Sequence, residues 1–325
     1  MKQLRAIMNS KLWGRGASAI NPGLVVATVV VFIVLSFASP YFLSVYNLMN
    51  VGKALVIVGI AAAGETLVII AGGFDLSIGS TMAAAGMLAA YLLDIGTGVG
   101  PAFLAAIVLG VCIGAANGTL IAYFRINPLI TTLATMAIIR GLAFVISDGR
   151  EIIITNKTWL SLGTGKWVGI PYIVLILIVI YLVFALILPR TTFGRYVYAI
   201  GSNPRAARLS GVSTKKWQLA IYITCGATAA LAGLMLAART GTAMPAAAMG
   251  FELDVITAVI LGGASLKGGR GTILGTAIGL ILLFMINNGL TLAQVPTFWQ
   301  QVVKGFILLA AVLYDEIRSG RSDDS

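Results

Sequence analysis

The sequence SNPRAARLSG, residues 202–211, is a short polar segment in a chain that is otherwise strongly apolar. Asn203 can accept hydrogen bonds from the first free N–H groups of a helix, and Pro204 fits the first helical position. Gly211 can adopt the left-handed conformation at a helix end. The segment therefore predicts a helix of about two turns. Because an isolated helix needs ~12 residues to be stable in water, its surroundings must hold it in place.

The composition around this segment is that of an integral membrane protein. Of 325 residues, 59% are hydrophobic and 10% are charged, and the mean hydropathy is +0.99. The 38 glycines and nine prolines lie mostly inside apolar runs, where neighbouring transmembrane helices can satisfy freed backbone groups. The apolar runs do not alternate with polar residues, so we expect an all-α membrane protein rather than a barrel.

Ten apolar runs are candidate transmembrane helices, each compared with the ~20 residues that a crossing needs. One of them, 253–265, is too short and must borrow flanking residues or be a broken element. An even number places both termini on one side. The runs are 23–40, 51–71, 77–93, 101–123, 128–147, 170–188, 217–237, 253–265, 272–289 and 297–314.

Charge sets the predicted orientation. The formal net charge is +11, and most lysines and arginines flank the apolar runs on one side, which the positive-inside rule assigns to the cytoplasm. The loop 189–216 carries six basic residues and no acidic one. We therefore predict a cytoplasmic tail at 1–22, one transmembrane domain at 23–314 with the cytoplasmic loop 189–216, and a second cytoplasmic tail at 315–325.

Several classes of function are excluded. The basic residues serve orientation, so nucleic acid is not an expected partner, whereas the lipid bilayer is. The chain has no histidine, and its two cysteines lie in apolar runs, so neither a metal site nor a disulfide is expected. No phosphate-binding loop of the Walker type occurs. We find no catalytic dyad and expect no enzyme activity.

The predicted helix in 202–211 has one smooth face. Ala206, Leu209 and Ser210 follow the i, i+3, i+4 spacing, and Arg205 and Arg208 flank them. Two interpretations remain at this point. The helix could lie on lipid headgroups, or it could dock a cytoplasmic partner through small side chains and directed salt bridges.

Three longer stretches carry a resemblance to a known family: GRYVYAIGSNPRAARLSGVSTKKWQ (194–218), AGGFDLSIGSTMA (71–83), and GFELDVITAVILGGASLKGGRGTILGT (250–276) with NNGL (287–290). Together they resemble the permease subunits of bacterial ABC importers. The branch concerned carries ribose and other monosaccharides and is related to the branched-chain amino acid permeases. The resemblance covers residues 45–315.

This resemblance implies a type II ABC importer-like permease fold in the bacterial inner membrane. It implies three kinds of partner: a second permease copy, two ATP-binding subunits or one fused ATPase, and a periplasmic sugar-binding protein. ATP and Mg²⁺ would bind the ATPase, and this chain would bind no cofactor. The helix in 202–211 would be the segment that couples to the ATPase, formed by Gly201, Asn203, Arg205, Ala206, Ala207, Arg208, Leu209, Ser210 and Gly211.

The other matched motifs have two interpretations each. In the first motif, Asp75 is either a helix N-cap or part of a conduit or gate; the motif glycines and serine are Gly72, Gly73, Ser77 and Gly79. Glu252 and Asp254 form either the acidic first turn of a helix or the mouth that receives cargo. Gly262 and Gly263 belong to a stretch that predicts a tight cytoplasmic turn.

Polar residues inside the predicted spans are candidate conduit residues, although helix–helix hydrogen bonds are the simpler interpretation. They are Glu65, Asn117 and Asn288, together with Thr131 and Thr132. Two further functions remain as alternatives: a membrane scaffold, and an ion-coupled secondary transporter, for which Glu65 and Lys304 are the best buried ionisable groups. The pattern resembles ribose permeases most, so ribose is the expected cargo, with xylose, arabinose, galactose, an autoinducer sugar and a nucleoside left open.

Overall fold

The computed structural model describes residues 22–323. The predicted tail 1–22 lies outside the described residues except for its last one, and so do the last two residues of the chain. The helices are α3 (Pro22–Ala38), α4 (Val45–Ile70), α5 (Ile78–Asp94), α6 (Val99–Ala122), α7 (Pro128–Ser147), α8 (Lys157–Thr164), α9 (Tyr172–Arg190), α10 (Thr192–Ser202), α11 (Pro204–Leu209), α12 (Thr214–Thr240), α13 (Phe251–Leu261), α14 (Ile273–Leu292) and α15 (Thr297–Asp323).

Each of the ten predicted segments coincides with a helix, but they are not equally long. Among residues 22–323, seven helices are long and apolar enough to cross a membrane, namely α4, α6, α7, α9, α12, α14 and α15. Helices α3 and α5 are apolar but have 17 residues each. For the segment 253–265 the structure agrees with the second of the two alternatives, a broken element, because α13 has only 11 residues.

The core is built around α4 and α12, and small residues let these helices approach their neighbours closely. On α4, every residue from Val56 to Ile70 is buried. On α12, Gly226 lies against the backbone of Gly110 in α6, so closely that a Cβ on Gly226 would clash with the Gly110 carbonyl oxygen. This packing follows the small-residue rule for membrane helices.

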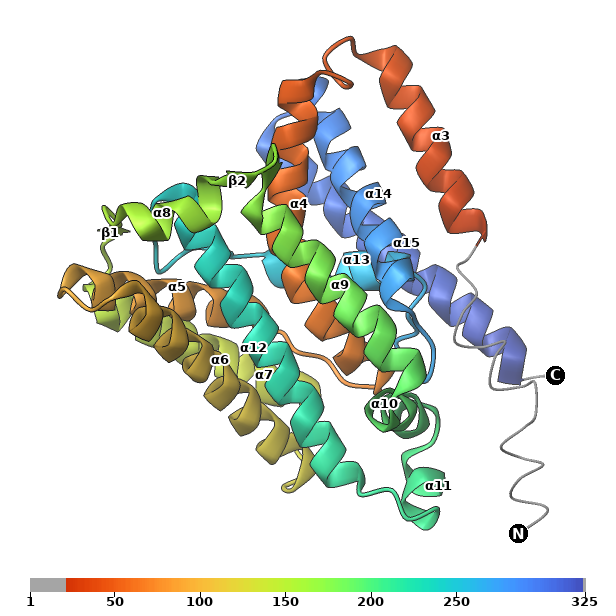
Figure 1. The fold of residues 1–325 in the computed structure, drawn as a ribbon. Helices are drawn as coiled ribbons and strands as arrows, with labels where there is room; N and C mark the ends of the chain where they lie inside the picture. Colours follow the sequence, from red (N-terminus) through yellow and green to blue (C-terminus); the bar gives the residue numbers. More distant parts are fainter. Residues whose placement is uncertain (1–21, 324–325) are drawn as a thin grey trace.

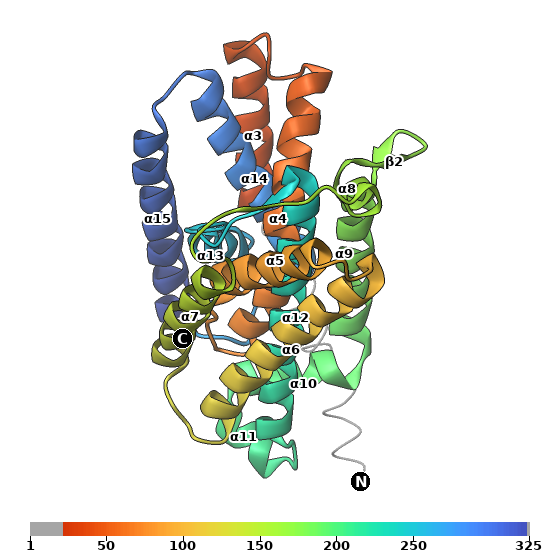
Figure 2. The same ribbon diagram turned by 90° about the vertical axis from the view of Figure 1, so that its left-hand side faces the viewer.

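Two short helices, α5 and α13, lie at mid-height and begin inside the molecule (Figure 1). The view after rotation places them close to each other at the same height (Figure 2). Helix α4 ends with Gly72 in the left-handed conformation at φ +80°, and Gly73 N–H bonds to the Val68 carbonyl. Such an ending reverses the chain abruptly, so that α5 starts within the bundle.

The two ends of the molecule differ. Helix α11 lies at one end, which we call the α11 end, and the loops that follow α3 and α14 lie at the opposite end (Figures 1 and 2). Two short antiparallel pairs complete the fold: β1 (Ile152–Ile153) with β4 (Thr242–Ala243), and β2 (Lys166–Trp167) with β3 (Ile170–Pro171).

The loop 189–216 and the end of the chain contain more helix than the sequence predicted. The loop 189–216 contains a second helix, α10, besides the predicted short one. Its apolar residues Phe193, Val197 and Ile200 repeat at helical spacing, and the last two are buried. The chain also has no break at 314, because α15 continues as helix to Asp323. Here Asp315 and Glu316 bind the loop between α13 and α14, which extends the helix beyond its apolar part.

Candidate functional site

Helix α11 has the caps that its sequence predicted. The Asn203 side chain accepts a hydrogen bond of 2.9 Å from Ala206 N–H, and Pro204 occupies the first turn. At the other end, Gly211 has φ +86°, its N–H bonds to the Arg208 carbonyl, and Val212 N–H bonds to the Ala207 carbonyl. This pair of bonds is a Schellman motif. Local interactions therefore define both ends of this six-residue helix.

The exposed face of α11 consists of Ala206, Leu209 and Ser210, as the spacing predicted. Leu209 is 85% exposed. Arg205 and Arg208 are exposed beside it. Ala207 differs from the prediction, because its side chain is 6% exposed and faces inward. Its side chain is therefore not part of the exposed face of α11.

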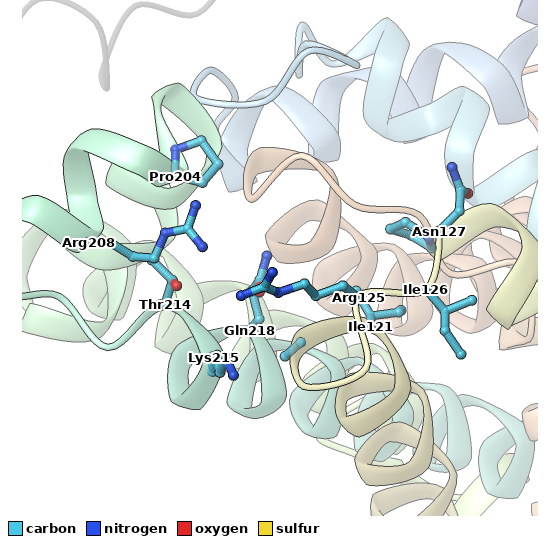
Figure 3. Close-up of a pocket in the computed structure, with 11 residues that line it drawn as sticks. Ile121, Arg125, Ile126, Asn127, Pro204, Arg208, Thr214, Lys215 and Gln218 are labelled. Carbon is cyan, nitrogen blue, oxygen red and sulfur yellow. The ribbon is translucent and has the colours of Figure 1, made fainter.

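A pocket of about 290 Å³ lies between α11, the start of α12 and the turn from α6 to α7. Figure 3 shows the Arg125 and Arg208 guanidinium groups pointing into the space between these elements. Lys215 adds a third positive charge to the lining and places its Nζ 5.4 Å from the centre of the Tyr123 ring. The pocket is therefore suited to an acidic group from outside the chain.

Helix α10 connects α11 to the core through backbone contacts at Gly201. A Cβ at Gly201 would clash with the Ile70 carbonyl at the end of α4 and would lie 2.5 Å from the Gly269 nitrogen. The Gly269 N–H donates to the Ile70 carbonyl at 2.8 Å. A Cβ added at Gly72 would lie 3.9 Å from the Lys267 carbonyl oxygen and 4.0 Å from the Gly201 Cα. We call this contact of α10, the end of α4 and the 262–272 loop the glycine junction.

Three further contacts hold the 262–272 loop at the glycine junction. The Tyr198 hydroxyl of α10 donates to the Gly271 carbonyl at 2.8 Å, and burial raises the pKa of Tyr198 to about 12, so the hydroxyl keeps its proton. Leu266 N–H donates to the Asp315 carboxylate at 2.9 Å. Lys267 pairs with Glu316 at 3.0 Å. The predicted tight turn is therefore present and is fastened to both α10 and α15.

Buried polar side chains surround the start of α5. Asp75 N–H donates to Glu65 Oε1 at 3.2 Å, and Ser77 N–H donates to Asp75 Oδ1 at 2.9 Å. Asn117 donates to Ser77 Oγ at 3.0 Å and accepts from Thr135 Oγ1 at 2.6 Å. This polar network connects α4, α5, α6 and α7. Each buried polar group here has a partner, as burial requires.

The polar network corrects the interpretation of Asp75 as a helix N-cap. The N-cap of α5 is Ser77, which makes no side-chain cap bond, and Asp75 lies two residues before it. Asp75 binds the N-cap residue instead of capping the helix. Asn117 makes helix–helix bonds, as the simpler interpretation predicted. Thr131 and Thr132 bond to carbonyls of their own helix region, four residues earlier.

Residues of the second motif lie on α13, at the height of α5 (Figure 2). Glu252 and Asp254 form the acidic first turn of α13, as one interpretation predicted. Asp254 Oδ2 also accepts from Lys304 Nζ of α15 at 2.8 Å, a pair that the sequence did not reveal. Gly79 lies close to Glu252 Oε2.

The remaining candidates are placed separately. Gly262 packs on the backbone of α14, and Gly263 takes the left-handed conformation at φ +88° where α13 ends. Asn288 exchanges two hydrogen bonds with Asn47, at 2.9 and 2.7 Å. The candidate residues therefore form an exposed helix surface at the α11 end, a polar network around the start of α5, and a second polar region that includes Asp254, Asn288 and Lys304.

The described residues hold no obvious catalytic machinery. Between residues 22 and 323, no group of three side chains could hold a metal ion, and both cysteines are free. The arrangement contains an exposed helix, α11, which is joined through α10 to the segments that flank the short helices α5 and α13.

Comparison with known proteins identifies the family. A family model described as "Branched-chain amino acid transport system / permease component" matches residues 47–312. The chain belongs to this permease family. No solved structure matches it.

The permease also has curated relatives along nearly its whole length. It is 39% identical over 296 residues to the L-arabinose transport system permease protein AraH of Escherichia coli K12, covering 91% of this chain and 90% of that one. It is 40% identical over 294 residues to the ribose import permease protein RbsC of the same strain, covering 89% and 92%. The RbsC protein of Bacillus subtilis 168 is 40% identical over 296 residues, covering 89% and 91%.

Family membership and the apolar helices make this permease a multi-pass membrane protein. It is a component of a transport system and not an enzyme.

Proposed function

We propose that this permease forms the translocation path of an ATP-driven monosaccharide importer in the bacterial inner membrane. The observation that carries the proposal is α11, a capped helix whose apolar and basic face is exposed and which follows directly on α10, whose Gly201 contacts the core at the glycine junction. A helix that only lies on lipid headgroups needs no close backbone contact with the segments beside α5 and α13. A helix that transmits movement to these segments does need such a contact.

The α11 end is cytoplasmic in this proposal, and both termini lie on that side, with ten helices arranged as in type II importers. Leu209 and the small residues beside it enter a cleft of the ATP-binding subunit. The basic pocket formed by Arg125, Arg208 and Lys215 receives an acidic side chain of the same subunit. Two permease copies and two ATP-binding subunits, or one fused ATPase, form the complex, and ATP with Mg²⁺ binds the ATPase.

The permease moves because the ATPase subunits contact α11 differently in their open and closed states. When ATP closes the partner subunits, α11 moves with them, and α10 transfers this displacement through Gly201 to the end of α4 and the 262–272 loop. The end of α4 precedes α5, and the 262–272 loop follows α13, so the short helices α5 and α13 shift together. The polar network keeps α5 registered to α4 and α6 during the movement.

The cargo is a sugar delivered by a periplasmic binding protein, with ribose as the first choice. Support comes from the ribose and arabinose permeases that are about equally similar. Arabinose is therefore the alternative cargo.

The test uses proteoliposomes that contain the permease, its ATPase and the sugar-loaded binding protein. We expect uptake of labelled ribose only when ATP and the binding protein are both present. Uptake by the permease alone, driven by a proton or sodium gradient, would instead establish the ion-coupled transporter. Uptake of arabinose but not ribose would change the assigned cargo and leave the mechanism intact.

A further inference from the structure

A polar cavity lies at the end opposite α11, between α4, α12, α13, α14 and α15. Its volume is about 460 Å³, within the range of roughly 300–1,000 Å³ found for small-molecule pockets. It lies in the first half of α4 and the second half of α14, far along both helices from the glycine junction. The coupling role therefore does not account for it.

The lining is rich in side-chain amides. They belong to Asn47, Asn50, Asn287, Asn288 and Gln300. Each amide offers both donors and an acceptor, which matches the hydroxyl groups of a sugar, since every hydroxyl donates and accepts. Phe251 and Phe284 add apolar surface to the same lining, which suits the C–H faces of a sugar ring.

The amides differ in how fully the protein itself satisfies them. Asn47 and Asn288 bond to each other, and Gln300 donates to the Val295 carbonyl at 2.8 Å. The Oδ1 atom of Asn287 is buried and has no hydrogen-bond partner among the described residues. A buried acceptor without a partner costs free energy, so this atom is ready to accept a hydrogen bond from a ligand.

A charged side chain in the lining provides a second group that can hydrogen-bond a ligand. Lys304 pairs with Asp254 at 2.8 Å, and both residues line the cavity. Arg239 lies at the end of α12 in the same lining and makes no hydrogen bond or ion pair to the described part of the chain. Its planar guanidinium carries several donors in a fixed fork, which can bind two neighbouring hydroxyls of one sugar.

We propose that this cavity binds a neutral monosaccharide on its way through the permease, with Arg239 and Asn287 as the residues that contact it. The proposal rests on the proposed function and adds to it a sugar site within the membrane subunit itself. Asn47, Asn288, Asp254 and Lys304 hold the walls in place through their mutual bonds.

The experiment compares three cavity variants with one control. Asn287→Ala removes the open acceptor, Arg239→Gln removes the guanidinium, and Ala54→Phe fills the cavity from α4, whose Ala54 belongs to the lining. Ala105→Phe is the matched control, because Ala105 on α6 is partly buried like Ala54 and lies outside the cavity. Helical content and elution volume establish that each variant is folded.

Two measurements are made on each protein. The first is ATP-dependent uptake of labelled ribose and arabinose in the reconstituted complex. The second is equilibrium binding of the same sugars to the permease alone in nanodiscs. We expect Asn287→Ala to weaken binding and uptake about 2- to 10-fold, as loss of one hydrogen bond does. Ala54→Phe should abolish binding, and Ala105→Phe should resemble the wild type.

The outcomes separate this inference from the proposed function. Wild-type uptake that is matched within about twofold by all three cavity variants overturns the cavity assignment and leaves the importer intact. Absence of ATP-dependent uptake in the wild type overturns the importer, while sugar binding in nanodiscs that Ala54→Phe abolishes still supports the cavity. Displacement of the bound label by a sugar acid at lower concentration than by a neutral sugar overturns the neutral-ligand assignment, because Arg239 and Lys304 would then serve an anion.

Discussion

Replacing Leu209 by alanine removes the largest apolar side chain from the exposed face of α11. The side chain is 85% exposed, so its loss leaves the packing of the permease unchanged and should shift the unfolding free energy by less than about 0.5 kcal/mol. In the proposed complex the same side chain is buried against the ATPase. Three carbon atoms at ~0.8 kcal/mol each, reduced to the exposed fraction, give about 2 kcal/mol. This corresponds to about 30-fold weaker binding.

The assay titrates purified ATPase onto the permease in nanodiscs and measures the dissociation constant, with ATP-driven sugar uptake as a second readout. Leu104→Ala is the control, since Leu104 on α6 is 63% exposed and distant from α11 in the chain. We expect Leu209→Ala to weaken binding and uptake and Leu104→Ala to change neither. If Leu209→Ala binds the ATPase as tightly as the wild type and unfolds at the same temperature, α11 is not the docking element and the reasoning fails.

Three other predictions concern the supports of α11. Gly201→Ala should lower the unfolding free energy by about 1–3 kcal/mol through overpacking at the glycine junction, whereas Gly52→Ala should not, because no atom lies within 4 Å of a Cβ there; thermal unfolding in detergent compares them. Asn203→Ala should speed amide hydrogen exchange throughout α11, with a cap loss of about 1 kcal/mol, and Asn203→Asp should restore the protection. Burial raises the pKa of Tyr198 from 10.0 to about 12, so the unfolded state ionises first, and this contribution to stability is fully present below about pH 10 and lost as the pH rises through about 12. Alkaline unfolding of Tyr198→Phe should lack that dependence.

Elements defined by local signals were predicted closely. Helix α7 spans Pro128–Ser147 as expected, because Asn127 caps it and Pro128 opens it. Helix α11 likewise follows from Asn203, Pro204 and Gly211. In each case a side chain satisfies backbone groups within a few residues, so the information is complete in a short segment.

Helix α4 shows where local reasoning falls short. It begins at Val45 instead of 51, because polar residues such as Asn47 and Asn50 hid its first turns in the hydropathy pattern. Asn47 is acceptable there because Asn288, remote in sequence, satisfies its amide. Helix α10 was also missed. It has only 11 residues, so its apolar face is too short to stand out in the hydropathy pattern, and contacts with α4 and α12 complete its packing.

The sequence by itself determined that the chain is helical and membrane-embedded, where most helices lie, and that 202–211 is a capped helix on a basic loop. Hydropathy and capping are properties of neighbouring residues, so they can be read along the chain. Only the tertiary structure placed Arg239 and Asn287 in the lining of one cavity and brought Gly201 to Ile70 and Asp254 to Lys304. These contacts join residues distant in sequence, and the packing of whole helices, rather than any local preference, selects which of them meet.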